Sequence, residues 1–186
     1  GKEGWSASAY LEPITGGNSK NLNVPVVHQR WDVGNSFNGD WACGPTSAVM
    51  AVAYFKKISP KPLSSSRPYP HTNDYGWYVF NQYTSGTGTT FSRKERDKNG
   101  NYWAGAYGTC MENGLGWAWR IQNYARGHGL RADFFDRANY DQIVRAIDSN
   151  QIVVLSTDIG GGHIICVRGY DKNGRYIIVN DPWGNR

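Results

Sequence analysis

The C-terminal third of the chain constrains the fold most, because it holds three strand-length apolar runs with no helix between them. We predict strands over residues 151–157, 163–170 and 175–180. The sequence Asp-Lys-Asn-Gly at 171–174 is typical of a hairpin turn between the last two. Strands joined this tightly pair antiparallel, because a parallel pair needs a long crossover connection. The sequence therefore predicts an antiparallel sheet at this end of the chain.

Helical patterns come before this sheet. Apolar residues recur at helical spacing over residues 44–55, and Pro45 suits the first turn of a helix. Similar patterns predict helices over residues 117–126 and 139–148, the second of them capped by Asn139. Helices that precede the strands, rather than alternate with them, indicate an α+β fold.

Other segments give weaker patterns. Residues 1–23 are expected to form an irregular arm, and the apolar run at 24–27 is expected to be an edge strand because it contains Pro25. A further short strand is predicted over residues 130–135.

The length of 186 residues favours one domain that buries its own core. We therefore treat residues 1–186 as a single domain. Residues 59–116 are rich in Pro, Gly and aromatic residues and have little periodicity, so we expect a loop-rich aromatic insert with a short helix near residues 75–83. No internal repeat is visible.

Composition excludes several classes of function. The 20 Lys and Arg residues outnumber the 15 Asp and Glu residues, giving a net charge of +5, which favours anionic partners. The basic residues are not clustered, so we expect no nucleic-acid partner. No apolar run reaches the roughly 20 residues of a membrane-spanning helix. The 8 Trp and 12 Tyr residues suit either a core or a binding groove.

One of the three cysteines has a context that favours reactivity. Cys43, Cys110 and Cys166 are too few and too widely spaced for a disulfide framework or a zinc site. Cys43 begins the strongest predicted helix, where free N–H groups and the helix dipole favour a thiolate and lower the pKa. Gly44 leaves the sulfur accessible. Cys43 is thus a candidate nucleophile, with a simple packed cysteine as the alternative, and Cys166 is expected to be buried in its strand.

His163 is the candidate base for this nucleophile. It follows three glycines and begins a predicted strand, so its ring can project into a cleft. The predicted hairpin returns the end of its second strand to the start of the first, which places Asp181 beside His163. Pro182 ends that strand and fixes the direction of the carboxylate. The alternatives are a histidine bonded to the backbone and an ordinary Asp-Pro turn.

Several motifs occur together in a recognisable order. They are Val-Pro-Val-Val-His-Gln at 24–29, Ala-Cys-Gly-Pro-Thr-Ser at 42–47, Gly-His at 162–163, Gly-Tyr-Asp at 169–171 and Asn-Asp-Pro-Trp-Gly at 180–184. In this order they resemble the bacteriocin-processing-peptidase-like (double-glycine-peptidase-like) family of papain-like cysteine peptidases. The resemblance covers residues 23–57 and 151–184 but does not extend to the insert.

The resemblance implies a papain-like arrangement, in which the helix that carries the nucleophile packs on the antiparallel sheet. It also implies Cys43 as the nucleophile, His163 as the base and then the acid, and Asp181 as the residue that orients the histidine. Gln29 is implied as a side-chain donor to the oxyanion, a role suited to a neutral amide. We expect Gln29 and Asp181 to lie at a cleft rather than in the core.

This chemistry requires no cofactor and no metal. The alternative that we keep is a structural calcium ion bound by Asp32 and Asp40, in the loop before Cys43.

We predict a cysteine endopeptidase that hydrolyses peptide cross-links of bacterial cell-wall peptidoglycan, as a secreted wall hydrolase or an endolysin of bacterial or phage origin. Its partner is then a peptide or peptidoglycan substrate, with room for a cell-wall-binding module outside this chain. The absence of a Walker-type phosphate loop argues against a transporter-linked role. Two alternatives stay open: a secreted protease or acyltransferase that acts on soluble peptides, and a non-catalytic binding module.

Overall fold

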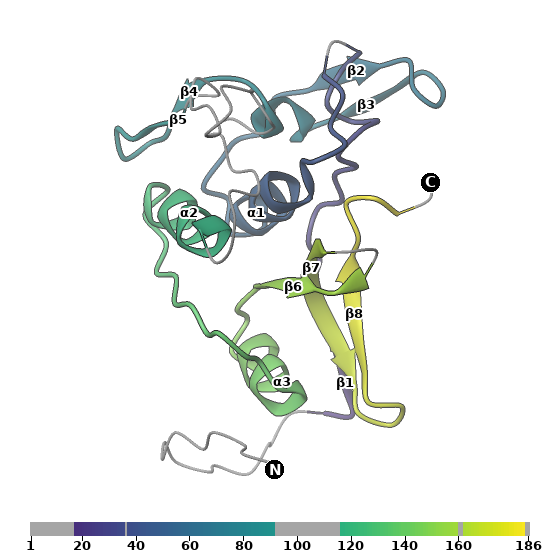
Figure 1. Cartoon of the computed structure of the whole chain (residues 1–186), viewed down its shortest axis with the longest axis vertical. Helices are drawn as coiled ribbons and strands as arrows, with labels where there is room; N and C mark the ends of the chain where they lie inside the picture. The colour runs from purple at the N-terminus through teal and green to yellow at the C-terminus, as the bar shows by residue number, and fades with distance from the viewer. Residues whose placement is uncertain (1–16, 36, 92–115, 160–161, 185–186) are drawn as a thin grey trace.

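The computed structural model describes residues 17–35, 37–91, 116–159 and 162–184, and every structural statement below concerns these ranges. The elements are, in chain order, β1 (Ser19–Asn21), α1 (Cys43–Tyr54), β2 (Leu63–Ser65), β3 (His71–Asn73), the 3-10 helix η1 (Gly76–Val79), β4 (Tyr83–Thr84), β5 (Thr90–Phe91), α2 (Gly116–Arg126), α3 (Tyr140–Asp148), β6 (Val153–Thr157), β7 (His163–Asp171) and β8 (Tyr176–Asn180). Figure 1 shows α1, α2, η1 and the small hairpins on one side of the molecule, and the sheet with α3 on the other.

The strand β7 is the centre of the main sheet and is paired along both of its edges. β8 pairs antiparallel with residues 166–171 of β7, and β6 pairs antiparallel with residues 163–167. β1 pairs antiparallel with residues 169–171. Because β8 overlaps both β6 and β1 along β7, these two share the opposite edge. The predicted antiparallel sheet and its hairpin turn are confirmed, and helices with such a sheet make the fold α+β.

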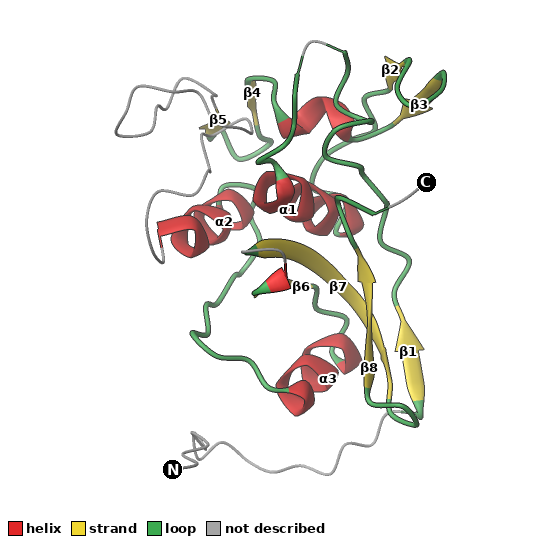
Figure 2. Ribbon diagram, turned by 45° about the vertical axis from the view of Figure 1, so that its right-hand side comes forward, coloured by secondary structure: helices red, strands yellow, loops and turns green. Residues whose placement is uncertain are grey.

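The helix α1 lies between the main sheet and η1, with α2 beside it, while α3 lies on the other side with the sheet (Figure 2). Residues 43–50 are all buried, and the helix is mostly apolar, as expected for a helix with little exposed surface. Its two buried polar side chains are Thr46 and Ser47. It packs against β7, β6, α2 and η1. The predicted position of this helix is confirmed.

The helix α3 also begins where the sequence predicts. The Asn139 side chain accepts from the N–H of Gln142, and the Gln142 side chain accepts from the N–H of Asn139, which makes a capping box. Its apolar residues Ile143, Val144 and Ile147 are buried, and the helix packs against β7. The helix predicted over residues 117–126 is also present, as α2.

The strands predicted over residues 24–27 and 130–135 are wrong. In both segments, backbone carbonyls accept hydrogen bonds from side chains rather than from a neighbouring strand. The Asn180 side chain donates to the carbonyls of Val24 (3.0 Å) and Pro25 (3.3 Å), so residues 24–27 run as irregular chain. Residues 130–135 are also irregular, since side chains of α2 donate to the carbonyl of Ala132. A strand that the sequence did not predict, β1, also pairs with β7, and it lies in the segment predicted as an irregular arm.

The insert is loop-rich where the structure describes it. Residues 59–91 contain only the two short hairpins β2–β3 and β4–β5, with η1 in place of the predicted helix near residues 75–83. Residues 92–115 of the insert, and Cys110 with them, lie outside the described residues.

Truncating Asn180 tests the bond that ties the chain before Gln29 to the sheet. We expect Asn180→Ala to lower the free energy of unfolding by about 1–3 kcal/mol, because it leaves two largely buried carbonyls without a donor. The exposed turn variant Asn173→Ala is the control and is expected to stay within about 0.5 kcal/mol of wild type. Urea denaturation measures both, and equal losses would contradict this role of Asn180.

Candidate active site

The thiol of Cys43 lies at the buried start of α1. The residue is 7% exposed. Burial raises the pKa of the thiol, and the negative charge of Asp181 adds to this, while backbone hydrogen bonds from Ile164, Gly44 and Cys43 itself oppose it. The net direction is upward, so the lowered pKa expected from the helix start is wrong. Desolvation outweighs the free N–H groups at the helix start.

Close packing of α1 on β7 brings Cys43 to the beginning of that strand. A Cβ atom on Gly44 would lie 3.2 Å from Cδ1 of Ile164, which is a tight contact, so the start of the helix packs closely on this side chain. The Ser47 hydroxyl donates to the carbonyl of Ile164 at 3.1 Å, in the interior. These contacts set the start of the helix beside the residue that follows His163.

The side chains of His163 and Asp181 are joined as the sequence predicts. Nε2 of His163 lies 2.7 Å from Oδ1 of Asp181, and the same oxygen accepts the backbone N–H of Trp183 at 2.8 Å. Because a carboxylate only accepts, the imidazole proton sits on Nε2 and Nδ1 stays available for another group. The His163 side chain is 15% exposed and that of Asp181 is 43% exposed. Asp181 thus lies at the surface, as expected.

Gln29 is fully buried rather than at a cleft, which corrects the expectation for its position. Its exposed fraction is 1%, and its Nε2 donates to the carbonyls of Gly39 at 2.7 Å and Asp40 at 3.1 Å. Its Oε1 is buried without a hydrogen-bond partner. Gly39 is at φ +77°, and a Cβ there would meet the backbone of Gln29, so only glycine allows this approach. In this structure the amide holds the loop that leads to Cys43.

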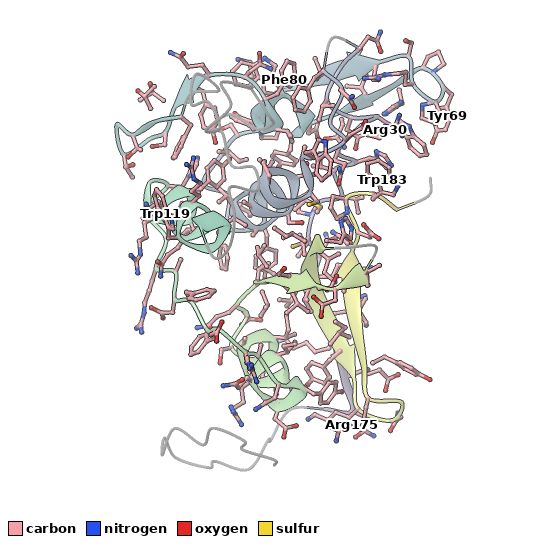
Figure 3. The ribbon with its side chains drawn as sticks, in the orientation of Figure 1. Arg30, Tyr69, Phe80, Trp119, Arg175 and Trp183 are labelled. Carbon is pink, nitrogen blue, oxygen red and sulfur yellow. The ribbon has the colours of Figure 1, made fainter. Side chains whose placement is uncertain are left out.

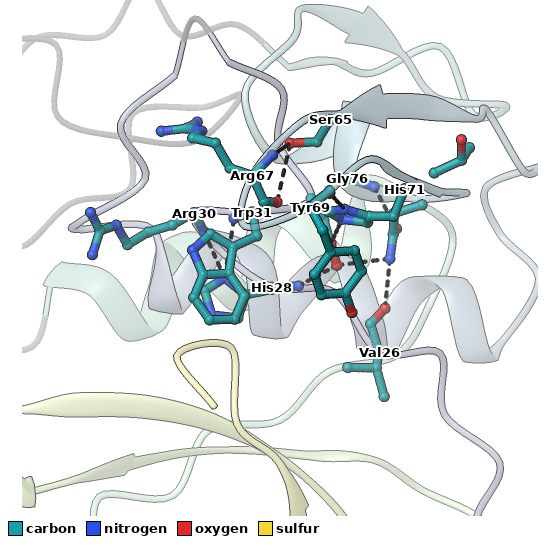
Figure 4. Close-up of polar contacts among 12 residues, drawn as sticks. Val26, His28, Arg30, Trp31, Ser65, Arg67, Tyr69, His71 and Gly76 are labelled. Atoms are coloured by element: carbon teal, nitrogen blue, oxygen red, sulfur yellow. Dashed lines mark hydrogen bonds and ion pairs between the residues drawn. The ribbon is translucent and has the colours of Figure 1, made fainter. Parts of the chain in front are cut away.

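A buried carboxylate supports the segment that carries Gln29 (Figure 4). Asp32 is fully buried and accepts from the N–H of His28 (2.6 Å), the side chain of Asn73 (2.8 Å) and Nε2 of His71 (2.7 Å). These bonds attach β3 to the segment. The carboxylate is satisfied by protein donors, as a buried charge must be.

The calcium alternative gains no support from these carboxylates. Asp40 pairs with Arg30 at 3.1 Å, and Asp32 is bound as described above. Within residues 17–35, 37–91, 116–159 and 162–184, no group of three or more His, Cys, Asp or Glu side chains is placed to hold a metal ion.

The other histidines are bonded away from α1. His28 accepts the backbone N–H groups of Arg30 and Trp31 on Nδ1, each at 3.1 Å. His128 is buried, and its Nδ1 lies 2.7 Å from the carbonyl of Tyr124. His163 directly precedes Ile164, which contacts Gly44 and Ser47 at the start of α1.

Sequence analysis missed two residues next to the predicted set. The guanidinium carbon of Arg30 lies 5.1 Å from the ring centroid of Trp183, which is a cation–π contact. The one sequence feature that could have identified them is their position, since Arg30 follows Gln29 and Trp183 comes two residues after Asp181.

Alkylation tests the difference between Cys43 and the strand cysteine. Cys166 is fully buried, and burial raises the pKa of its thiol to about 12. We expect iodoacetamide to label Cys43 while Cys166 stays unlabelled in the folded protein, measured by peptide mass spectrometry. Because the pKa of Cys43 is also raised, its rate should increase with pH across the alkaline range. Equal labelling of both, or a rate already independent of pH near neutrality, would contradict this environment.

Comparison with known proteins identifies the family of the chain. The chain matches the Peptidase_C39 like family over residues 21–186. No curated protein and no solved structure matches the chain. In the part of the chain that the structure describes, no helix is long and apolar enough to cross a membrane. The matched range contains the candidate nucleophile, the histidine and its aspartate, and the chain belongs to the Peptidase_C39 like family, a family of cysteine peptidases.

Proposed function

We propose that this chain is a papain-like cysteine peptidase in which Cys43, His163 and Asp181 act together on an amide bond. The observation that carries this proposal is the 2.7 Å bond between His163 and Asp181, placed where α1 packs on the start of β7. A histidine oriented by a carboxylate beside a helix-start cysteine is the arrangement that activates a thiol. The alternative of a non-catalytic module is disfavoured, because such a module has no need of this bond.

The proposed reaction starts from the neutral thiol. Nδ1 of His163 takes the proton of Cys43, and the thiolate attacks the carbonyl carbon of the substrate. The imidazolium then protonates the leaving amine as the carbon–nitrogen bond breaks, which leaves a thioester on Cys43. Water, deprotonated by His163, attacks the thioester and releases the carboxylic acid and the thiol. Asp181 holds the ring with Nδ1 toward the sulfur and stabilises its charged form.

Two donors are proposed for the oxyanion of the tetrahedral intermediate. One is the backbone N–H of Cys43, since α1 has no side-chain cap at its start. The other is Gln29, whose bond to the carbonyl of Asp40 is the longer of its two and is the one that we propose is exchanged for the oxyanion. Its bond to Gly39 then keeps the amide in place during the exchange.

The proposed substrate is the peptide cross-link of bacterial cell-wall peptidoglycan. A net charge of +5 favours an anionic polymer. Trp41 and Trp183 are 52% and 44% exposed, and they lie two residues from Cys43 and Asp181. Exposed aromatic side chains at these places are suited to hold an extended peptide or glycan. Such an enzyme acts outside the cytoplasm, as a secreted wall hydrolase or a lysin.

Replacing Gln29 separates its proposed chemical role from its structural one. We expect Gln29→Ala to lower kcat by about 10²–10³-fold, because a lost oxyanion donor weakens the transition state. We also expect a lower melting temperature, because the side chain is buried and holds two carbonyls. Kinetics are measured well below both melting temperatures.

The control for this prediction is a core truncation far from the site. Val144→Ala on α3 removes buried apolar volume and should lower the melting temperature while turnover stays near wild type. Wild-type turnover in folded Gln29→Ala would show that the amide acts only as a loop support.

Digestion of purified peptidoglycan tests the substrate. Mass spectrometry should detect cleaved cross-links with wild type and none with Cys43→Ala. The initial rate should fall between about 0.1 and 1 M salt, as the Debye length shortens from about 10 Å to about 3 Å. Cleavage of soluble peptides without cleavage of peptidoglycan would favour the secreted-protease alternative, and a rate unaffected by salt would contradict attraction to the anionic wall.

A further inference from the structure

We propose that Arg30 is a positioning residue for the candidate catalytic pair, which it serves by holding Trp183 against Asp181. This inference rests on the peptidase function proposed above and adds a residue to that same site. Arg30 contacts neither His163 nor Cys43 in any bond described here, so its effect must pass through other residues.

Arg30 connects two loops that belong to different parts of the site. Its guanidinium carbon lies 5.1 Å from the ring centroid of Trp183, in the turn after β8. Its Nε lies 3.1 Å from Oδ1 of Asp40, in the loop before Cys43, as an ion pair without hydrogen-bond geometry. Figure 3 shows Arg30 and Trp183 on the same side of the molecule, near the C-terminal end of the described chain. We call Arg30, Asp40 and Trp183 the clasp.

The clasp reaches the catalytic pair through the backbone of Trp183. The N–H of this residue donates to Oδ1 of Asp181 at 2.8 Å, and the same oxygen accepts from His163 at 2.7 Å. Any shift of the Trp183 backbone therefore changes the direction of the carboxylate oxygen that orients the imidazole. A second tie acts on the same turn, because the N–H of Gln29 donates to the carbonyl of Pro182 at 2.8 Å.

The clasp lies too near the surface for stability to be its main role. The side chains of Arg30 and Asp40 are 42% and 40% exposed, and Trp183 is 44% exposed. Exposed ion pairs and surface cation–π contacts contribute little to folding. The same contacts can restrict one exposed turn, and the Asp181 side chain beside this turn is itself 43% exposed.

Two variants of Arg30 test this role. Arg30→Met keeps an aliphatic stem but removes the charge, and we expect kcat on soluble cross-linked muropeptides to fall about 3- to 30-fold with KM nearly unchanged. Arg30→Lys keeps a cation over the indole and should restore kcat to within about threefold of wild type. Trp183→Ala should cause a similar loss, and the double variant Arg30→Met with Trp183→Ala should lose no more than the larger single loss, since both changes break one unit.

Matched controls come from the same kinds of contact elsewhere on the surface. Arg131→Ala breaks an exposed ion pair with Asp133 at 3.0 Å, and Arg175→Ala breaks a cation–π contact with Tyr140 at 4.8 Å. Both should leave kcat and KM at wild-type values. A rise in KM at constant kcat in Arg30→Met would instead identify Arg30 as a substrate-binding residue and overturn the positioning role.

A measurement that does not depend on catalysis, the tautomer of the His163 ring, distinguishes this inference from the proposed function. ¹⁵N NMR of the neutral His163 ring should report the proton on Nε2 in wild type and Arg131→Ala, and a mixture of both tautomers in Arg30→Met. If wild type cleaves no substrate while the tautomer responds to Arg30→Met, the peptidase proposal fails and the positioning role stands. If wild type cleaves substrate while Arg30→Met changes neither kcat nor the tautomer, the positioning role is overturned.

Discussion

The packing of α1 on β7 is the contact on which the rest of the site depends. Ser47 and Ile164 are 117 positions apart in the sequence, and their hydrogen bond lies in the interior. Since β7 is paired along both edges, it gives the helix a fixed surface to pack on. Gly44 leaves room for the side chain of Ile164 against the start of the helix. The start of a helix and the start of a strand thereby meet, and each brings one candidate catalytic residue.

Burial at this contact has a chemical consequence. The same packing that positions Cys43 removes its thiol from water and raises its pKa. A buried thiol of raised pKa needs a base to become a thiolate, so the proposed reaction depends on the orientation of His163. The bond from Asp181, and the turn that holds Asp181, are then the parts of the site where small displacements matter most.

Much of this arrangement could be predicted from local sequence patterns. The helix at Cys43, the cap at Asn139 and the hairpin that returns Asp181 to His163 all follow from periodicity, capping residues and turn residues, which act over short distances. The errors came from long-range side-chain bonds. The Asn180 side chain binds a carbonyl of residues 24–27, where a strand was predicted. The Gln29 side chain points into the interior and donates to the carbonyls of Gly39 and Asp40, ten and eleven residues further along the chain. No local pattern reports such partners, nor the balance between burial and the helix dipole at Cys43.

The most direct test of this account is to trap the proposed thioester. Rapid-quench mass spectrometry of the enzyme with a cross-linked muropeptide should find an acyl adduct that maps to Cys43, and His163→Ala should form it far more slowly. An adduct on another residue, or product formation that persists in Cys43→Ala, would contradict the central claim that Cys43 and His163 work as nucleophile and base.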